Sequence, residues 1–117
     1  MQNIAMILKR PPYGDINAAE AVRHARGAVS SEINVALILV DGGVLLAKKG
    51  QDESATGFTN LGDSLRDCIE MGVSVYADIA SLKAKGVASS DLLVNVKPVG
   101  WKEIAGLIKD AESTMIF

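Results

Sequence analysis

The residues of this chain best suited to chemistry are one thiol and two carboxylates. Cys68 is the single cysteine, so any thiol chemistry of this chain depends on it. Asp41 and Asp78 each follow an apolar segment that has the character of a strand. Carboxylates at the ends of neighbouring strands can approach each other and form part of a ligand site, but such residues also commonly cap the next turn or helix. Both interpretations of Asp41 and Asp78 stay open.

The position of Cys68 argues against a reactive thiol. Leu61, Leu65, Cys68 and Ile69 recur at helical spacing, which predicts a buried side chain that serves packing. The crossover helix that carries Cys68 runs antiparallel to the strands, so its last turn lies at the amino edge of the sheet. We therefore predict a structural role for Cys68; a catalytic role requires that the thiol be exposed.

Other motifs for catalysis or cofactor binding are missing or misplaced. The letters Gly62-Asp63-Ser64-Leu65 match a serine hydrolase motif, but they fall inside an amphipathic helix and no histidine is placed to serve as the base. The single histidine, His24, lies among charged residues and is predicted to be exposed. One histidine and one cysteine do not make a zinc site, and neither a dinucleotide fingerprint nor a phosphate-binding loop is present. We expect no metal ion and no cofactor.

The elements that must position these residues alternate between strands and helices. Nearly unbroken apolar runs predict strands that are covered on both faces, and the intervening stripes predict amphipathic helices. This alternation predicts an α/β fold: three α/β/α layers around a mostly parallel sheet of about five strands. The predicted strands span residues 4–8, 33–40, 73–76, 93–99 and 114–117, the helices lie around residues 18–29, 61–69, 79–82 and 104–111, and residues 41–59 form a long irregular loop.

The carboxyl edge of this sheet is where a binding site is expected. Ligands of open α/β sheets lie in the loops beyond the carboxyl ends of the strands. The loop after the first strand is rich in polar and conformationally restricted residues, and the next two strands end at the carboxylates already named. The candidate binding residues are Lys9, Arg10, Tyr13, Gly14, Asp41 and Asp78.

Composition limits the kinds of partner that this chain can have. Its 117 residues favour one domain spanning residues 1–117. A net charge of −2 with scattered basic residues argues against direct nucleic-acid binding, and from the residues we expect neither a signal peptide nor a membrane-spanning segment. The lone cysteine fits a reducing cytoplasm. An apolar content of 49% and a mean hydropathy of +0.24 favour a homo-oligomer, in which surplus apolar surface is buried.

In its motifs the chain resembles the DsrE/DsrF family of sulfur-relay proteins, most closely the DsrF/TusC branch. The likeness extends over nearly the whole length, and no single element is diagnostic, but their order and spacing are specific. The elements are Pro11-Pro12-Tyr13-Gly14 after the first strand, Ala19-Glu20 in an alanine-rich helix, Val40-Asp41-Gly42-Gly43-Val44, Gly50-Gln51, Ser81-Leu82 with Gly86-Val87, and the terminal Met115-Ile116-Phe117.

The resemblance implies an α/β subunit of a trimer or hexamer that passes sulfur between proteins as a cysteine persulfide, in tRNA thiolation or sulfur metabolism. It places the sulfur-bearing cysteine just after the third strand, at the position of Asp78, and a carboxylate cannot carry a persulfide. We therefore expect an accessory, non-catalytic subunit rather than an enzyme, with itself or DsrE/DsrH-like proteins as partners. The alternatives are a small-ligand-binding or regulatory homo-oligomer on the same scaffold, and a sulfur carrier that uses Cys68.

Overall fold

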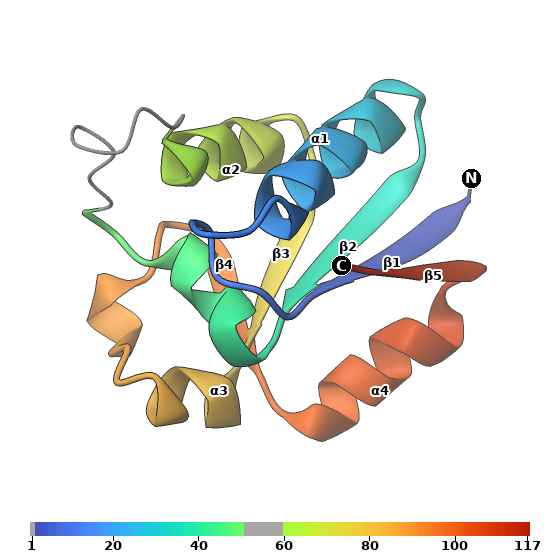
Figure 1. Cartoon of the computed structure of the whole chain (residues 1–117). Helices are drawn as coiled ribbons and strands as arrows, with labels where there is room; N and C mark the ends of the chain where they lie inside the picture. The colour runs from blue at the N-terminus through green and yellow to red at the C-terminus, as the bar shows by residue number, and fades with distance from the viewer. Residues whose placement is uncertain (1, 51–59) are drawn as a thin grey trace.

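A five-stranded parallel sheet forms the centre of the protein (Figure 1). The structure is a computed structural model that describes residues 2–50 and 60–117. The order of the strands across the sheet is β4-β3-β2-β1-β5, and each neighbouring pair is parallel. The strands are β1 (Asn3–Leu8), β2 (Asn34–Leu39), β3 (Ser74–Asp78), β4 (Val96–Val99) and β5 (Ser113–Ile116).

Helices cover both faces of this sheet, as the alternating pattern predicts. Helices α1 (Asn17–Ser30) and α2 (Leu61–Glu70) pack side by side on one face, and α4 (Trp101–Asp110) lies on the other (Figure 1). The short helix α3 (Ile79–Ala84) and the 3-10 segment η1 (Asp41–Ala47) follow the carboxyl ends of β3 and β2 directly and contact each other. A second 3-10 segment, η2 (Ser89–Asp91), comes after α3. The predicted three-layer α/β/α fold is confirmed.

The main core lies between the sheet and the pair α1 and α2. In β1 and β2 this core contains the buried side chains Met6, Leu8, Val35, Leu37 and Leu39. Ala5 and Ile38, which alternate with them and face the other side of the sheet, are buried as well. Burial on both faces explains why the two strands are almost unbroken apolar runs. The buried face of α1 is built largely from small side chains, which allow the helix to approach the sheet and α2 closely. The largest fully buried side chains are Met6, Leu8, Leu37, Ile38, Leu39, Leu46 and Leu65.

The opposite face of the sheet is covered less completely. Helix α4 has no buried residue, and its apolar side chains Ile104, Leu107 and Ile108 are only half-buried. Trp101 at its start is 73% exposed, and Ile116 in β5 is 65% exposed. This face therefore leaves apolar surface in contact with solvent in the isolated chain.

Two predicted segments differ from the structure. The predicted strand over residues 93–99 is too long, because Asn95 has a left-handed backbone (φ 71°) that interrupts an extended chain and leaves only Val96–Val99 in the sheet. The predicted irregular loop over residues 41–59 is wrong in its first part, where the buried Val44 and Leu46 hold the 3-10 segment η1 against the core. Residues 51–59, including Gln51 of the Gly50-Gln51 pair, lie outside the described residues.

Candidate functional site at the carboxyl edge and the helix pair behind it

Asp78 ends β3 and begins α3, so it occupies the position where a parallel sheet presents residues to a ligand. Its side chain caps α3: Oδ2 accepts hydrogen bonds from the backbone N–H of Ser81 at 3.1 Å and from the Ser81 hydroxyl at 2.5 Å. The capping interpretation of Asp78 is therefore confirmed. Whether this carboxylate also binds a ligand stays a prediction.

Asp41 also contacts Ser81, but through its backbone N–H group. Its N–H donates a hydrogen bond of 2.8 Å to the Ser81 hydroxyl oxygen, so one buried serine joins the ends of β2 and β3. Asp41 itself is exposed and has a left-handed backbone (φ 49°), and the structure gives no side-chain cap at the start of η1. The expected approach of Asp41 to Asp78 thus occurs, but by way of the Asp41 main chain and Ser81.

Two glycines allow η1 to cross the end of β1. A side chain at Gly43 would overlap the carbonyl oxygen of Leu8, and one at Gly42 would come within 3.0 Å of the Pro11 ring. Glycine is required where two backbones come this close. The crossing brings the end of β2 next to the Lys9-Arg10 turn, whose two side chains are exposed.

Cys68 lies away from this edge. Its side chain is fully buried between α2 and α1, where Sγ donates a weak hydrogen bond of 3.7 Å to the carbonyl oxygen of Val22. The carbonyl of Cys68 accepts a hydrogen bond from Val73, next to the first residue of β3, whereas Asp78 is the last residue of that strand. At about 3.3 Å of rise per residue, the length of β3 separates the two positions by about 13 Å.

The environment of Cys68 disfavours its reactive form. Burial raises the pKa of the thiol, and the nearby Arg26 opposes this effect without cancelling it. Because only the thiolate is a strong nucleophile, the thiol is held in its unreactive state at neutral pH. The predicted burial of Cys68 is confirmed.

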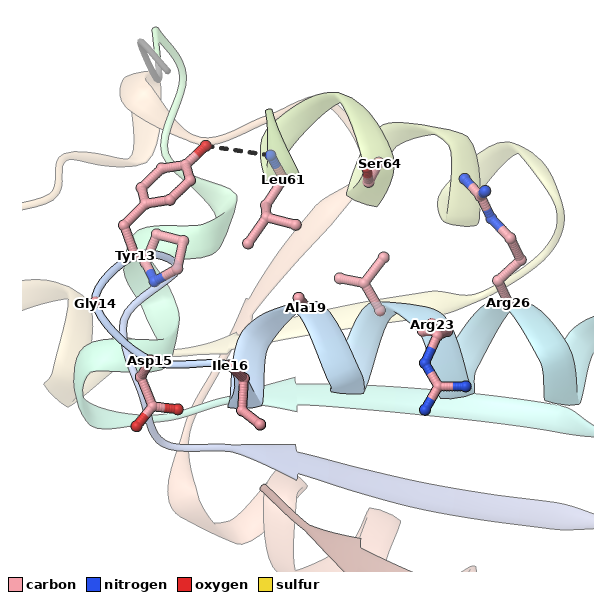
Figure 2. A pocket seen from close by; sticks show the side chains of 11 residues that line it. Tyr13, Gly14, Asp15, Ile16, Ala19, Arg23, Arg26, Leu61 and Ser64 are labelled. Atoms are coloured by element: carbon pink, nitrogen blue, oxygen red, sulfur yellow. Dashed lines mark hydrogen bonds between the residues drawn. The ribbon is translucent and has the colours of Figure 1, made fainter. Parts of the chain in front are cut away.

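A concave slot lies between the starts of α1 and α2, on the same side of the sheet as Cys68 (Figure 2). It has a volume of about 590 Å³. Two of the predicted binding residues, Tyr13 and Gly14, line it, and the Tyr13 hydroxyl accepts a hydrogen bond of 3.3 Å from the N–H of Leu61. Asp41 and Asp78 are not among the described residues that line this slot, so the predicted binding residues do not form a single site.

His24 is less exposed than predicted. Its ring is half-buried and packs against that of Phe117, with 5.4 Å between ring centroids, and its Nδ1 lies 2.7 Å from the carbonyl oxygen of Glu20. In the described residues no group of three or more histidine, cysteine, aspartate or glutamate side chains is arranged to hold a metal ion. Over the same residues no helix is both long and apolar enough to span a bilayer.

Comparison with known proteins decides the family. The model of the DsrE/DsrF-like family matches residues 2–117, which is almost the whole chain. The chain belongs to the DsrE/DsrF-like family. The family resemblance expected from the motifs around Tyr13, Asp41 and Ser81 is thereby confirmed.

Individual relatives match this family member over different shares of their length. The protein MJ0989 of Methanocaldococcus jannaschii is 30% identical over 112 residues, 96% of each chain. The intracellular sulfur oxidation protein DsrF of Allochromatium vinosum is 30% identical over 86 residues, which are 73% of this chain and 63% of DsrF. The crystal structure of the ychN protein from E. coli matches with a TM-score of 0.91 over all of both chains at 21% identity, a likeness that shows the fold alone.

Sequence reasoning missed the residues that connect these features. In the sequence Ser81 stands out only as part of the Ser81-Leu82 motif, although its hydroxyl joins two strand ends. Arg23, Arg26 and Leu61 of the slot were not selected at all, because no linear signal shows that α2 begins beside the loop after β1.

Proposed function

We propose that this chain is an accessory, non-catalytic subunit of a sulfur-relay assembly, rather than a sulfur carrier or an enzyme with turnover. The proposal rests on its membership of the DsrE/DsrF-like family and on its likeness to an intracellular sulfur oxidation protein. The observation that carries it is the position of the only thiol. Cys68 is fully buried, and the position where the resemblance places a sulfur-bearing cysteine holds Asp78.

The state of Asp78 supports this role. Its carboxylate accepts two hydrogen bonds from Ser81 and so contributes to the joint between the ends of β2 and β3. Because its carboxylate is occupied by these hydrogen bonds, Asp78 stabilises the carboxyl edge of the sheet. Such a subunit would contribute a shaped surface to the assembly, while the persulfide is held by a partner.

Assembly is the second part of the proposal. Ile79, Trp101 and Ile116 are each at least half exposed, and α4 leaves its side of the sheet incompletely covered. Apolar surface of this kind is commonly covered by subunit contacts. We infer a homo-oligomer, a trimer or hexamer, that also associates with DsrE/DsrH-like or other sulfur-relay proteins.

Sulfur loading tests the non-catalytic role. The chain is incubated with a cysteine desulfurase and ³⁵S-labelled cysteine, and the label bound to the chain is measured before and after reduction by a thiol. The native chain should retain no reducible label, because Cys68 is inaccessible. Label that is retained by the native chain and lost in Cys68→Ser would assign the carrier role to Cys68 and refute the proposal.

A variant with a thiol at position 78 extends the loading test, because it is expected to gain the label that the native chain lacks. In a Cys68→Ala background, Asp78→Cys places a thiol at the start of α3, where free N–H groups favour a thiolate. We expect this variant to accept label, and the matched variant Ser89→Cys, an exposed thiol away from the β3 end, to accept much less. Equal labelling of both variants would show that position 78 has no special relation to sulfur transfer.

Co-purification tests the accessory role. The tagged chain is recovered from its native host at its natural level, and the associated proteins are identified by mass spectrometry. We expect a sulfur-relay partner that carries a reactive cysteine. A strictly homomeric particle without such a partner would contradict the proposal.

A second candidate function is a small-ligand-binding or regulatory homo-oligomer. The slot beside Tyr13 and Gly14 favours it. The form of this hypothesis that uses Asp41, Asp78, Lys9 and Arg10 predicts that Asp78→Ala abolishes a metabolite-induced thermal shift and leaves the oligomer intact. No shift across a broad panel of metabolites would remove its support.

A further inference from the structure

The slot between α1 and α2 has no part in the accessory role proposed above, yet it has the dimensions of a ligand site. Its volume of about 590 Å³ falls in the range of roughly 300–1,000 Å³ typical of pockets for small molecules. Such pockets are mostly apolar, with a few polar groups that orient the ligand. The slot has this composition.

Apolar groups form most of its wall. From α1 and the loop before it come the side chains of Pro12, Ile16, Ala19 and Val22, and Leu61 faces them from the first turn of α2 (Figure 2). The ring of Tyr13 closes one end and is held there by the hydrogen bond between its hydroxyl and the N–H of Leu61. An apolar group that enters the slot gains roughly 25 cal/mol for each Å² of apolar surface removed from water.

Charged groups also line the slot: the carboxylate of Asp15 at the end near Tyr13, and two guanidinium groups toward the other end. Arg26 extends from α1 toward α2 at that end, whereas Arg23, one turn earlier on α1, directs its side chain away from α2 (Figure 2). Each guanidinium pairs with one exposed or half-exposed carboxylate: Arg23 with Glu20 at 2.5 Å, and Arg26 with Asp67 at 3.6 Å. Exposed ion pairs of this kind contribute little free energy, so the arginines can turn to an anion in the slot at small cost.

We propose that this slot binds a small molecule with an apolar body and a single anionic head group. The body lies between Tyr13, Ala19 and Leu61, and the head group accepts hydrogen bonds from Arg26, with Arg23 as a second donor once its side chain turns toward the slot. The positive charge of Arg26, at the end of the apolar slot remote from the Asp15 carboxylate, favours an anionic head group there over a neutral or cationic one. The head group is a carboxylate or a phosphomonoester, both of which match the planar guanidinium.

This inference is independent of the accessory role. Ligand binding in the slot requires no thiol, and sulfur loading requires no ligand in the slot. Failure of the binding experiment below would leave the sulfur-loading result unaffected, and the reverse holds as well.

The binding experiment uses 1-anilinonaphthalene-8-sulfonate, a fluorescent probe that combines an apolar ring system with one negative charge. We expect a saturable rise in its fluorescence with the native chain and competition by decanoate or decyl phosphate. Decanol and decyltrimethylammonium, which present the same chain length with a neutral and a cationic head, should compete at least 10-fold less well. The stronger of the two anionic competitors identifies the head group. Equal competition by all four compounds, or the absence of saturable binding, would overturn the proposal.

Variants locate the bound probe. Arg26→Gln should weaken binding about 10-fold, the effect of losing one charge-assisted hydrogen bond, and Arg23→Gln should weaken it less. Arg66→Gln is the control for loss of an exposed arginine, because Arg66, like Arg23, makes an i,i+3 ion pair, with Asp63 at 3.0 Å, and is not among the slot residues. Ala19→Phe fills the slot from the exposed side of α1 and should abolish binding.

A last control separates the slot from other apolar surface. Trp101→Ala removes the most exposed aromatic side chain of α4 and should leave the affinity for the probe unchanged. Circular dichroism of each variant shows that it is folded. Binding that survives Ala19→Phe in a folded variant, or that is lost in Trp101→Ala, would place the probe elsewhere and refute the proposed site.

Discussion

The hydroxyl of Ser81 donates a 2.5 Å hydrogen bond to the carboxylate of Asp78. The same hydroxyl oxygen accepts a hydrogen bond from the N–H of Asp41, so a single side chain, only 7% exposed, connects the carboxyl ends of two neighbouring strands. Hydrogen bonds in series polarise one another, and the charged acceptor strengthens this one. The carboxyl edge of the sheet is therefore held by a polar joint as well as by packing.

Removal of this joint should destabilise the protein measurably. Ser81→Ala leaves the Asp41 N–H without its acceptor and takes one of two hydrogen bonds from Asp78, which should lower the free energy of unfolding by about 1–3 kcal/mol. Urea denaturation followed by circular dichroism at a fixed protein concentration measures the change. The control is Ser30→Ala, whose exposed hydroxyl bonds the Arg26 carbonyl and whose loss should change stability by less than about 0.5 kcal/mol. Equal effects of the two substitutions would show that the joint contributes nothing.

The thiol of Cys68 should react only when the structure opens. Because the side chain is fully buried, 5,5′-dithiobis(2-nitrobenzoate) should modify the native chain at the rate of local or global unfolding, and one thiol per chain should react at once in 8 M urea. Absorbance at 412 nm reports both rates. Complete modification of the native chain within the mixing time would mean that the thiol is accessible, and would reopen the carrier role.

The raised pKa of Cys68 should also make stability depend on pH. In the unfolded chain the thiol ionises near pH 8.5, whereas burial keeps it protonated in the folded chain to a higher pH. Between these two pKa values the folded state binds more protons, so its stability is complete below about pH 8.5 and falls as pH rises. The difference in unfolding free energy between the native chain and Cys68→Ala should shrink above that pH. A difference that stays constant to pH 10 would show that the pKa of the folded thiol is not raised.

Gly43 and Gly106 should respond in opposite ways to the same substitution. Gly43→Ala forces a Cβ atom into the Leu8 carbonyl and within 2.8 Å of the Leu8 carbonyl carbon, so backbone must move and the loss should exceed about 3 kcal/mol. Gly106→Ala, in α4, meets open space and should raise stability by about 0.5–1 kcal/mol through helix propensity. Thermal melts of the two variants check this contrast. A folded Gly43→Ala chain with native stability would refute the close crossing of η1 over β1.

The fold was largely predictable because most of its elements follow local patterns. Four of the five strands begin and end within two residues of their predicted bounds, since runs such as Ile4–Leu8 must be buried on both faces. The stripe that contains Cys68 likewise predicted its burial. The exception is β4, which begins three residues later than hydrophobicity indicates, because the left-handed conformation of Asn95 interrupts the extended chain just before it.

The site was less predictable because it depends on contacts between distant segments. Asp78 and Ser81 are three residues apart, and their capping bond is a local feature, but the bond from Asp41 to Ser81 joins residues 40 positions apart. The half-buried ring of His24 packs against Phe117, which lies at the other end of the chain. The slot requires that the loop around Tyr13 meet the start of α2. Periodicity reports which side of an element is buried and does not report which neighbour it meets.

The position of β5 has a consequence for how the chain folds. Strands β1 to β4 lie side by side in the order of the sequence, whereas β5 returns across the sheet to pair with β1, where Ile4 aligns with Ser113. That pairing closes almost the whole chain into one loop, so its entropic cost is the largest of any strand contact, and such contacts form slowly. In pulse-labelled hydrogen exchange the amides of β5 should therefore become protected after those of β2 and β3, and until then the outer edge of β1 stays open to pairing with another molecule.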